Sequence, residues 1–248
     1  MYKVETMRPA IDAIFIDVGN TLRILIKDEQ HQSAARREIA KLIGSQESPE
    51  ILCARLDERY KIYRKWAFET WIEAPESELW TRWLLPDIPK EKIAPIADQL
   101  TYHYRQSMGR RVLQQDARQV VSELSRRGYQ LGIISNVITA KEIPEWLEAD
   151  GLAQYFKAVV LSSITGRRKP NPEVYWDAAR RIGVPPEKCV YVGDNLARDV
   201  VGTRIAGFGM IVILNSPQEL EKNPPTSENQ PDVIIHEFKQ LLDIFPTC

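Results

Sequence analysis

Short apolar runs alternate with amphipathic stretches along most of this chain. Six runs rich in isoleucine, valine and other apolar residues cover positions 13–17, 130–135, 157–162, 189–193, 209–214 and 232–235. A run that is apolar at nearly every position is typical of a strand buried on both faces of a parallel sheet. Between and after these runs, helices are expected at 116–127, 172–182, 199–206 and 237–245. Strands that alternate with helices predict an α/β fold with a doubly wound parallel sheet.

One long segment, from about residue 28 to residue 109, breaks this alternation. Its apolar positions recur at helical spacing, and it contains no run typical of a strand. We therefore predict an all-helical insertion after the first strand, with residues 1–27 and 110–248 forming the α/β core domain and residues 28–109 forming the helical domain. This segment contains four tryptophans, Trp66, Trp71, Trp80 and Trp83. They could line a substrate pocket, but packing inside the small helical domain is the favoured interpretation.

Charge and composition narrow the classes of function. The chain has 33 Lys and Arg against 34 Asp and Glu, a net charge of −1, which argues against a nucleic-acid partner or a membrane partner bound through bulk charge. Three widely spaced cysteines indicate neither a disulfide framework nor a zinc site. The first residues lack the apolar core of a signal peptide, so a cytoplasmic protein is the expectation; the oligomeric state is not indicated. One basic stretch is interpreted as a solvated helix face: Arg55, Arg59, Lys61, Arg64 and Lys65.

Polar residues follow several predicted strands, where an open parallel sheet gathers its ligands. Asp17, Ser135 and Asp194 stand at three strand ends, and Lys169 lies in the loop after the third run. Paired carboxylates suit Mg²⁺, while an ammonium and a hydroxyl suit phosphate oxygens. A carboxylate can also attack phosphorus. Each residue alone has a structural explanation, such as a turn or a helix cap, but together they predict a site for a phosphoryl group and a magnesium ion around Asp17.

The order of these residues resembles the haloacid dehalogenase superfamily, most of whose members are Mg²⁺-dependent phosphatases. The resemblance rests on four ordered segments: DVGNTL with Asp17, IISN with Ser135, RKPNPEVY with Lys169, and GDNLARD with Asp194 and Asp199. The helical insertion resembles, in position and class, the cap of the phosphoglycolate-phosphatase-like branch. This resemblance implies a Rossmann-like core with a helical cap after its first strand.

The same resemblance implies roles for the matched residues. Asp17 is the implied nucleophile, which forms an aspartyl-phosphate, and Lys169 steadies it and the transferring phosphoryl group. Ser135 and Asn136, together with Lys169, are the implied phosphate-binding residues. The implied magnesium ligands are Asp17, the carbonyl of Gly19, Asp194 and, in support, Asp199.

Gly19 departs from the family pattern. The phosphatases carry a second aspartate at this position, which acts as a general acid and then a base, and such help is typically worth about 10²- to 10⁴-fold in rate. The leading hypothesis is therefore a Mg²⁺-dependent phosphohydrolase of a small phosphorylated metabolite that favours leaving groups needing no proton. A cap residue or a water could also replace the missing acid.

Other functions stay open at this stage. Family members that cleave phosphonoacetaldehyde lack the second aspartate and use a cap lysine that forms a Schiff base. Lys41, Lys61 and Lys65 are candidates for such a lysine, although a surface role is favoured for all three. A metal-independent dehalogenase also lacks that aspartate, but the retained metal motif speaks against it. A low-activity or non-catalytic phosphometabolite-binding protein is motivated by Gly19 and opposed by the retained Asp17.

Overall fold

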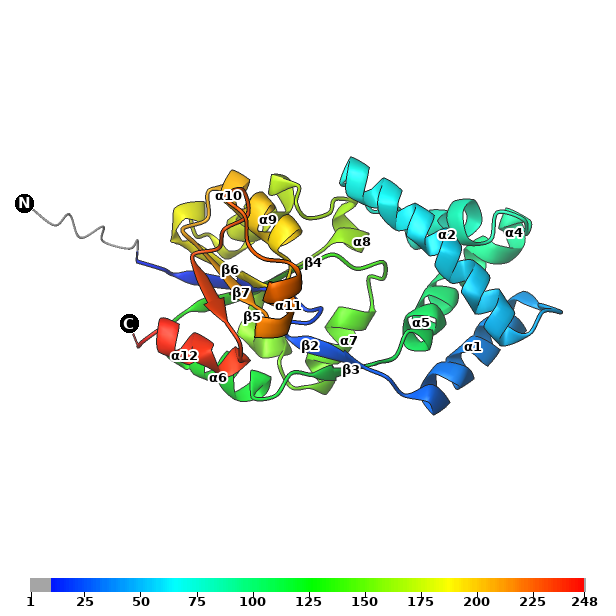
Figure 1. Ribbon diagram of the computed structural model, residues 1–248, viewed down its shortest axis with the longest axis horizontal. Coiled ribbons are helices and arrows are strands. Elements are labelled where there is room, and N and C mark those ends of the chain that lie inside the picture. The colour runs from blue at the N-terminus through cyan, green and yellow to red at the C-terminus, as the bar shows by residue number, and fades with distance from the viewer. Residues whose placement is uncertain (1–9, 248) are drawn as a thin grey trace, which may run out of the picture.

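The computed structural model describes residues 10–247 and has a six-stranded parallel sheet at its centre (Figure 1). The strand order is β5-β4-β1-β6-β7-β8, so the chain winds away from β1 in both directions. The strands are β1 Ala13–Ile16, β4 Gln130–Ser135, β5 Phe156–Leu161, β6 Cys189–Gly193, β7 Met210–Leu214 and β8 Val233–Ile235. All six coincide with the predicted apolar runs within about two residues, which confirms the doubly wound α/β fold.

Helices cover both faces of this sheet, which explains why its strands are apolar at nearly every position. Ile14 and Ile16 of β1 face one apolar cluster, and Ala13 and Phe15 face another. The first cluster contains α6 (Ala117–Arg126), α7 (Glu142–Ala149) and α12 (Leu241–Ile244). The second contains α9 (Pro172–Ile182) and α10 (Val201–Ala206), on the opposite side of the sheet in Figure 1. The shorter helices of this part are α8 (Ser162–Thr165) and α11 (Pro217–Lys222).

The segment from residue 28 to residue 109 is mainly helical, as expected. It forms α1 (Glu29–Ile43), α2 (Pro49–Thr70), α3 (Glu76–Glu78), α4 (Lys90–Ile93) and α5 (Ala97–Ser107), which group beside the sheet (Figure 1). These helices share an apolar core of their own, which includes Leu52, Tyr63, Trp80 and Tyr104. The exact domain boundaries stay a prediction.

The tryptophans of this segment mostly pack within it. Trp80 is fully buried and donates its indole N–H to the Thr101 hydroxyl at 2.8 Å. The rings of Trp66 and Trp83 lie 5.1 Å apart, whereas Trp71 is 37% exposed. None of the four lines the cavity that is described below. Packing was therefore the better interpretation for this cluster.

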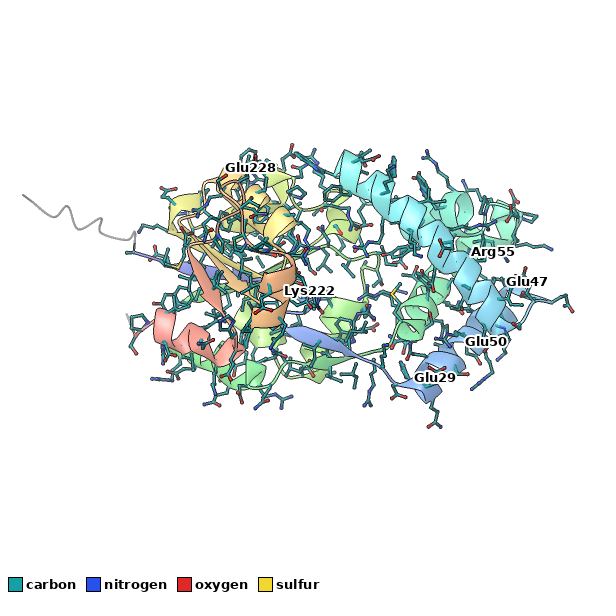
Figure 2. All side chains as sticks on the ribbon, in the orientation of Figure 1. Glu29, Glu47, Glu50, Arg55, Lys222 and Glu228 are labelled. Carbon is teal, nitrogen blue, oxygen red and sulfur yellow. The ribbon has the colours of Figure 1, made fainter. Side chains whose placement is uncertain are left out.

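The basic residues of α2 lie away from that cavity too. Figure 2 shows Arg55 and Glu47 in the outer part of the helical segment, far from the sheet, and the two side chains form an ion pair of 2.7 Å. Arg59 pairs with Asp87, and Lys61 with Glu58 at 2.6 Å. These contacts match the expected solvated helix face.

Two short strands that the sequence analysis did not predict join the helical segment to the sheet. β2 (Arg23–Ile26) and β3 (Arg110–Leu113) pair in an antiparallel ribbon that runs between the two parts in Figure 1. The register places Leu25 opposite Arg111. This ribbon brings residues from both sides of the insertion to the carboxyl edge of the sheet.

A second connection fixes the loop that carries Lys169. Ile72 and Arg167 form an antiparallel bridge, and Glu73 N–H donates to the Gly166 carbonyl at 2.9 Å. The fully buried Glu73 carboxylate also accepts hydrogen bonds from the Ser162 hydroxyl at 2.6 Å and from the Arg168 guanidinium. The loop just before Lys169 is thereby held against the helical segment.

Among residues 10–247, no helix has the length and apolarity needed to cross a bilayer.

Candidate functional site

Three predicted site residues meet at the carboxyl ends of three adjacent strands. Asp17 follows β1, Ser135 ends β4 and Asp194 follows β6, and β1 lies between β4 and β6. Strand order in the sheet therefore brings Asp17 together with two residues that lie more than a hundred positions away in the chain. The Asp17 N–H still continues the ladder, donating to the Val192 carbonyl at 2.8 Å.

Lys169 places its ammonium between two carboxylates of this edge. Its Nζ lies 2.9 Å from Asp17 Oδ2 and 3.1 Å from Asp199 Oδ1, and its side chain is fully buried. It also donates to the hydroxyl of Tyr191, which donates to the Ile134 carbonyl at 3.2 Å. Tyr191 was missed by the sequence analysis because it lies inside a strand whose pattern is explained by burial alone.

The side chain of Asn136 holds the backbone of Lys169. Its Oδ1 accepts from the Lys169 N–H at 2.8 Å, and its Nδ2 donates to the Lys169 carbonyl at 3.0 Å. The amide therefore positions the lysine, and a phosphate contact of Asn136 stays a prediction. Ser135 differs, because it lines the cavity at this edge and its hydroxyl makes no hydrogen bond with any residue between 10 and 247.

Asp17, Asp194 and Asp199 form a carboxylate cluster. One carboxylate oxygen from each residue lies within 4.8 Å of a carboxylate oxygen of the other two. Asp199 is completely buried, and it fits against β6 because Gly193 has no side chain: a Cβ there would stand 2.5 Å from Asp199 Oδ2. Although burial works to raise it, the Arg198 guanidinium and the Lys169 ammonium hold the pKa of the Asp199 carboxyl at about 2.

Arg198 inserts a guanidinium into this cluster, which the sequence analysis did not anticipate. Its Nη2 lies 3.2 Å from Asp17 Oδ2 and 3.3 Å from Asp194 Oδ1, and its Nε lies 3.0 Å from Asp199 Oδ1. The signal was present in GDNLARD, where Arg198 directly precedes Asp199. A single arginine thus contacts all three carboxylates.

The cluster still carries more negative than positive charge. Three carboxylates face two cations, Lys169 and Arg198, within ion-pair distance. Burial, with the neighbouring Asp17 and Asp199 charges, raises the pKa of Asp194 to about 6. An oxygen-only donor set with an unbalanced negative charge fits a hard divalent cation. The acidic cluster could therefore hold a metal ion. In this structure the Arg198 guanidinium is the cation that contacts its three carboxylates.

A small cavity of about 240 Å³ opens at Val18 and Gly19, directly after Asp17 in the chain, between the sheet edge and the ribbon of β2 and β3. Gly19 and Ser135 line one part of it, and a Cβ on Gly19 would meet no atom within 4 Å. Among the described lining residues there is no Asp, Glu, His or Lys. Within the described part of the chain, the lining of this cavity therefore offers no carboxylic acid, imidazole or ammonium in place of the aspartate that the resemblance leads one to expect at position 19.

The lysines considered for a Schiff base lie elsewhere. None of Lys41, Lys61 and Lys65 lines this cavity, and each is more than two thirds exposed with a glutamate nearby on its own helix. The structure gives these residues the surface role that was favoured for them.

Comparison with known proteins agrees with this geometry. The family model described as haloacid dehalogenase-like hydrolase matches residues 11–207. A glyceraldehyde 3-phosphate phosphatase of Methanopyrus kandleri is 34% identical over 122 residues, which is 49% of this chain and 52% of the relative. The chain thus aligns with about half the length of that relative. A phosphoserine phosphatase of Thermus thermophilus is 26% identical over 83% of this chain and 90% of its own length.

Solved structures share the fold over nearly the whole chain. A haloacid dehalogenase from Pseudomonas syringae pv. Tomato has a TM-score of 0.67 at 20% identity, with 94% of this chain and 97% of the other covered. A magnesium-bound hydrolase from Bacillus subtilis has a TM-score of 0.65 at 22% identity, with 95% and 99% covered. The family match, the sheet order and the meeting of the four motifs at one edge agree: this chain belongs to the haloacid dehalogenase-like hydrolases.

Proposed function

We propose that this protein is a Mg²⁺-dependent phosphohydrolase that cleaves a small phosphorylated metabolite through an aspartyl-phosphate. The observation that carries the proposal is the environment of Asp17. Its Oδ1 accepts the Val18 N–H at 2.7 Å, and its Oδ2 faces the Lys169 ammonium at 2.9 Å. A carboxylate fixed in this way, beside a cavity with a free hydroxyl, suits attack on phosphorus. The phosphatase names of the relatives support a small phosphorylated substrate.

Each residue near Asp17 has a defined part in this reaction. Asp17 attacks phosphorus, a new P–O bond forms, and the bond to the leaving group breaks. Lys169 and Arg198 offset the negative charge of the reacting oxygens, and the Ser135 hydroxyl donates to a phosphoryl oxygen. Water then attacks phosphorus, phosphate departs, and the Asp17 carboxylate is restored. A Mg²⁺ ion held by Asp17, Asp194, Asp199 and the Gly19 carbonyl would supply further charge neutralisation.

Magnesium is expected to raise the melting temperature of the wild-type protein. A ligand present at 100 times its dissociation constant stabilises a fold by about 2.7 kcal/mol, which corresponds to several degrees for a chain of this size. Asp194→Asn should lose most of this shift, because it removes one charged ligand. Thermal unfolding with and without Mg²⁺ measures the effect.

For the metal-free protein, Asp194→Asn is expected to have the opposite effect and not to lower stability. The pKa of Asp194 is raised, so its charged form is disfavoured in the folded state, and stability is lost as pH rises from the ordinary carboxyl pKa of 3.8 to about 6. Metal-free Asp194→Asn should therefore be at least as stable as wild type at neutral pH. Asp177→Asn, outside the cluster, is the control that keeps the magnesium shift. A wild type without any shift would contradict the metal proposal.

Gly19 is expected to restrict the leaving group. Acetyl phosphate releases a weakly basic acetate, whereas an alkyl phosphate ester needs a proton on its departing oxygen. Wild type should therefore prefer acetyl phosphate, and Gly19→Asp should raise turnover of the ester by about 10²- to 10⁴-fold. The open space around Gly19 accepts the new side chain. Steady-state phosphate release from both substrates measures the preference.

Gly19→Asn is the matched control, because it adds the same bulk without an acid and should not rescue the ester. Equal wild-type turnover of both substrates would show that Gly19 is no handicap. Turnover of neither substrate, with gain only in Gly19→Asp, would favour the phosphometabolite-binding alternative.

A further inference from the structure

Three arginines from separate elements line the cavity that also contains Gly19 and Ser135. Arg23 comes from β2, Arg105 from α5 and Arg111 from β3. Trp146 of α7 lies among them: the Arg23 guanidinium stands 4.5 Å from the centre of its ring and that of Arg105 stands 6.0 Å away. The planar ring holds the two guanidinium groups in place. The cavity therefore joins the edge that carries Asp17 to a preorganised cationic wall.

The protein neutralises only two of these three charges. Arg23 forms an ion pair with Asp150, and Arg105 forms one with Glu142. Arg111 has no carboxylate within ion-pair distance among residues 10–247; its Nη1 donates to the Arg105 carbonyl at 2.9 Å.

Arg111 nevertheless keeps its charge. Burial, with the nearby Arg105, lowers the pKa of its guanidinium to about 10 despite the opposing charge of Glu142, so it remains positive at neutral pH. A partly buried cation without a directly paired carboxylate is costly unless a ligand supplies the opposite charge, and Glu142, the nearby carboxylate, is already paired with Arg105.

A second hollow near the site lacks this property. It has a volume of about 720 Å³, shares Asn20 with the arginine-lined cavity and is also lined by Asp194. Its described lining residues include no arginine or lysine and include the acidic Asp194 and Glu219. It does not suit an anion, which leaves the arginine-lined cavity for a charged part of a substrate.

We propose that Arg111, supported by Arg23 and Arg105, binds a second anionic group of the substrate, on the part that leaves when phosphate is cleaved. The inference rests on the proposed function, because it takes the phosphoryl group to sit at Asp17. A cavity of 240 Å³ is smaller than the roughly 300–1,000 Å³ of pockets for drug-sized ligands, so only a few carbon atoms separate the two groups. The substrate class is a small phosphorylated metabolite with a carboxylate or a second phosphate.

Binding of small phosphonates tests this subsite without requiring turnover. Methylphosphonate offers the phosphoryl mimic alone, phosphonoacetate adds a carboxylate, and ethylene diphosphonate adds a second phosphate-like group. Calorimetry on the wild-type protein with Mg²⁺ should show that at least one of the two larger probes binds about 10- to 100-fold more tightly than methylphosphonate, the range expected for a charge-assisted contact. The probe that gains more identifies the anionic group.

Two variants on the ribbon should remove this gain. Arg111→Gln deletes the cation. Leu25→Glu places a carboxylate directly opposite Arg111 across the ribbon and within the same cavity. Arg110→Gln is the matched control, because the neighbouring Arg110 side chain is 55% exposed and is not among the residues that line the cavity. It should keep the gain.

The outcomes separate this inference from the proposed function. Failure of both larger probes to gain affinity, or a gain that survives in both Arg111→Gln and Leu25→Glu, overturns the subsite. A gain that depends on Arg111 upholds it even if no substrate is hydrolysed, in which case only the phosphohydrolase proposal fails. Turnover of acetyl phosphate without any gain upholds the phosphohydrolase and overturns the subsite alone.

Discussion

Replacing Asp17 with asparagine is expected to lower Mg²⁺-dependent phosphate release by about 10⁴-fold or more, the scale seen when a catalytic nucleophile is removed. Asparagine has the same shape and still accepts the Val18 N–H through Oδ1, but it cannot attack phosphorus. Lys169 retains Asp199 as a counter-ion, so the fold should persist. Phosphate release from acetyl phosphate, with circular dichroism and thermal unfolding, separates lost chemistry from lost structure.

Asp12→Asn is the control for this experiment. Asp12 stands just before β1 and forms a half-exposed ion pair of 3.0 Å with Lys188, outside the site. It should leave turnover close to that of wild type. An Asp17→Asn protein that keeps its turnover would show that another group attacks the substrate.

Replacing Lys169 with methionine should both abolish turnover and destabilise the protein. The change leaves Arg198 alone to face three carboxylates, two of them buried. Removing one partner from a buried ion pair costs about 3–5 kcal/mol, because the other charge stays buried without compensation. Thermal and denaturant unfolding measure the loss.

Lys188→Met provides the matched comparison, since its exposed pair with Asp12 should be worth about 1 kcal/mol or less. Adding Asp199→Asn to Lys169→Met should restore part of the stability but none of the turnover. Equal losses of stability in the Lys169 and Lys188 variants would contradict the buried role of Lys169.

Much of this fold and site could be predicted because the signals are local. Each strand of the sheet is apolar at nearly every position, because both faces are covered by helices, and such a run can be recognised in the sequence. Asp17 and Asp194 follow two such strands and Ser135 ends a third, and parallel pairing brings these strand ends to one edge. These three candidate residues were predicted from the ends of the strands, whereas Lys169 was predicted from a loop.

The remaining features depend on contacts that leave no local pattern. β2 and β3 are four residues each and only partly buried, so neither forms a recognisable run, and their pairing joins segments more than eighty positions apart. The meeting of Arg23 and Arg111 follows from that pairing. The contacts of the Arg198 side chain with the cluster depend on the direction in which a helical turn points it. In the structure it points toward Asp17 and Asp194 and forms ion pairs with both.

The covalent state of Asp17 during turnover tests the central claim most directly. Wild-type protein is mixed with Mg²⁺ and acetyl phosphate, quenched in acid within one turnover, digested and examined by mass spectrometry. We predict one phosphoryl group on the peptide that contains Asp17, absent when magnesium is omitted and absent in Asp17→Asn. Phosphate release with the phosphoryl group on a different residue, or equally fast release by Asp17→Asn, would contradict the account.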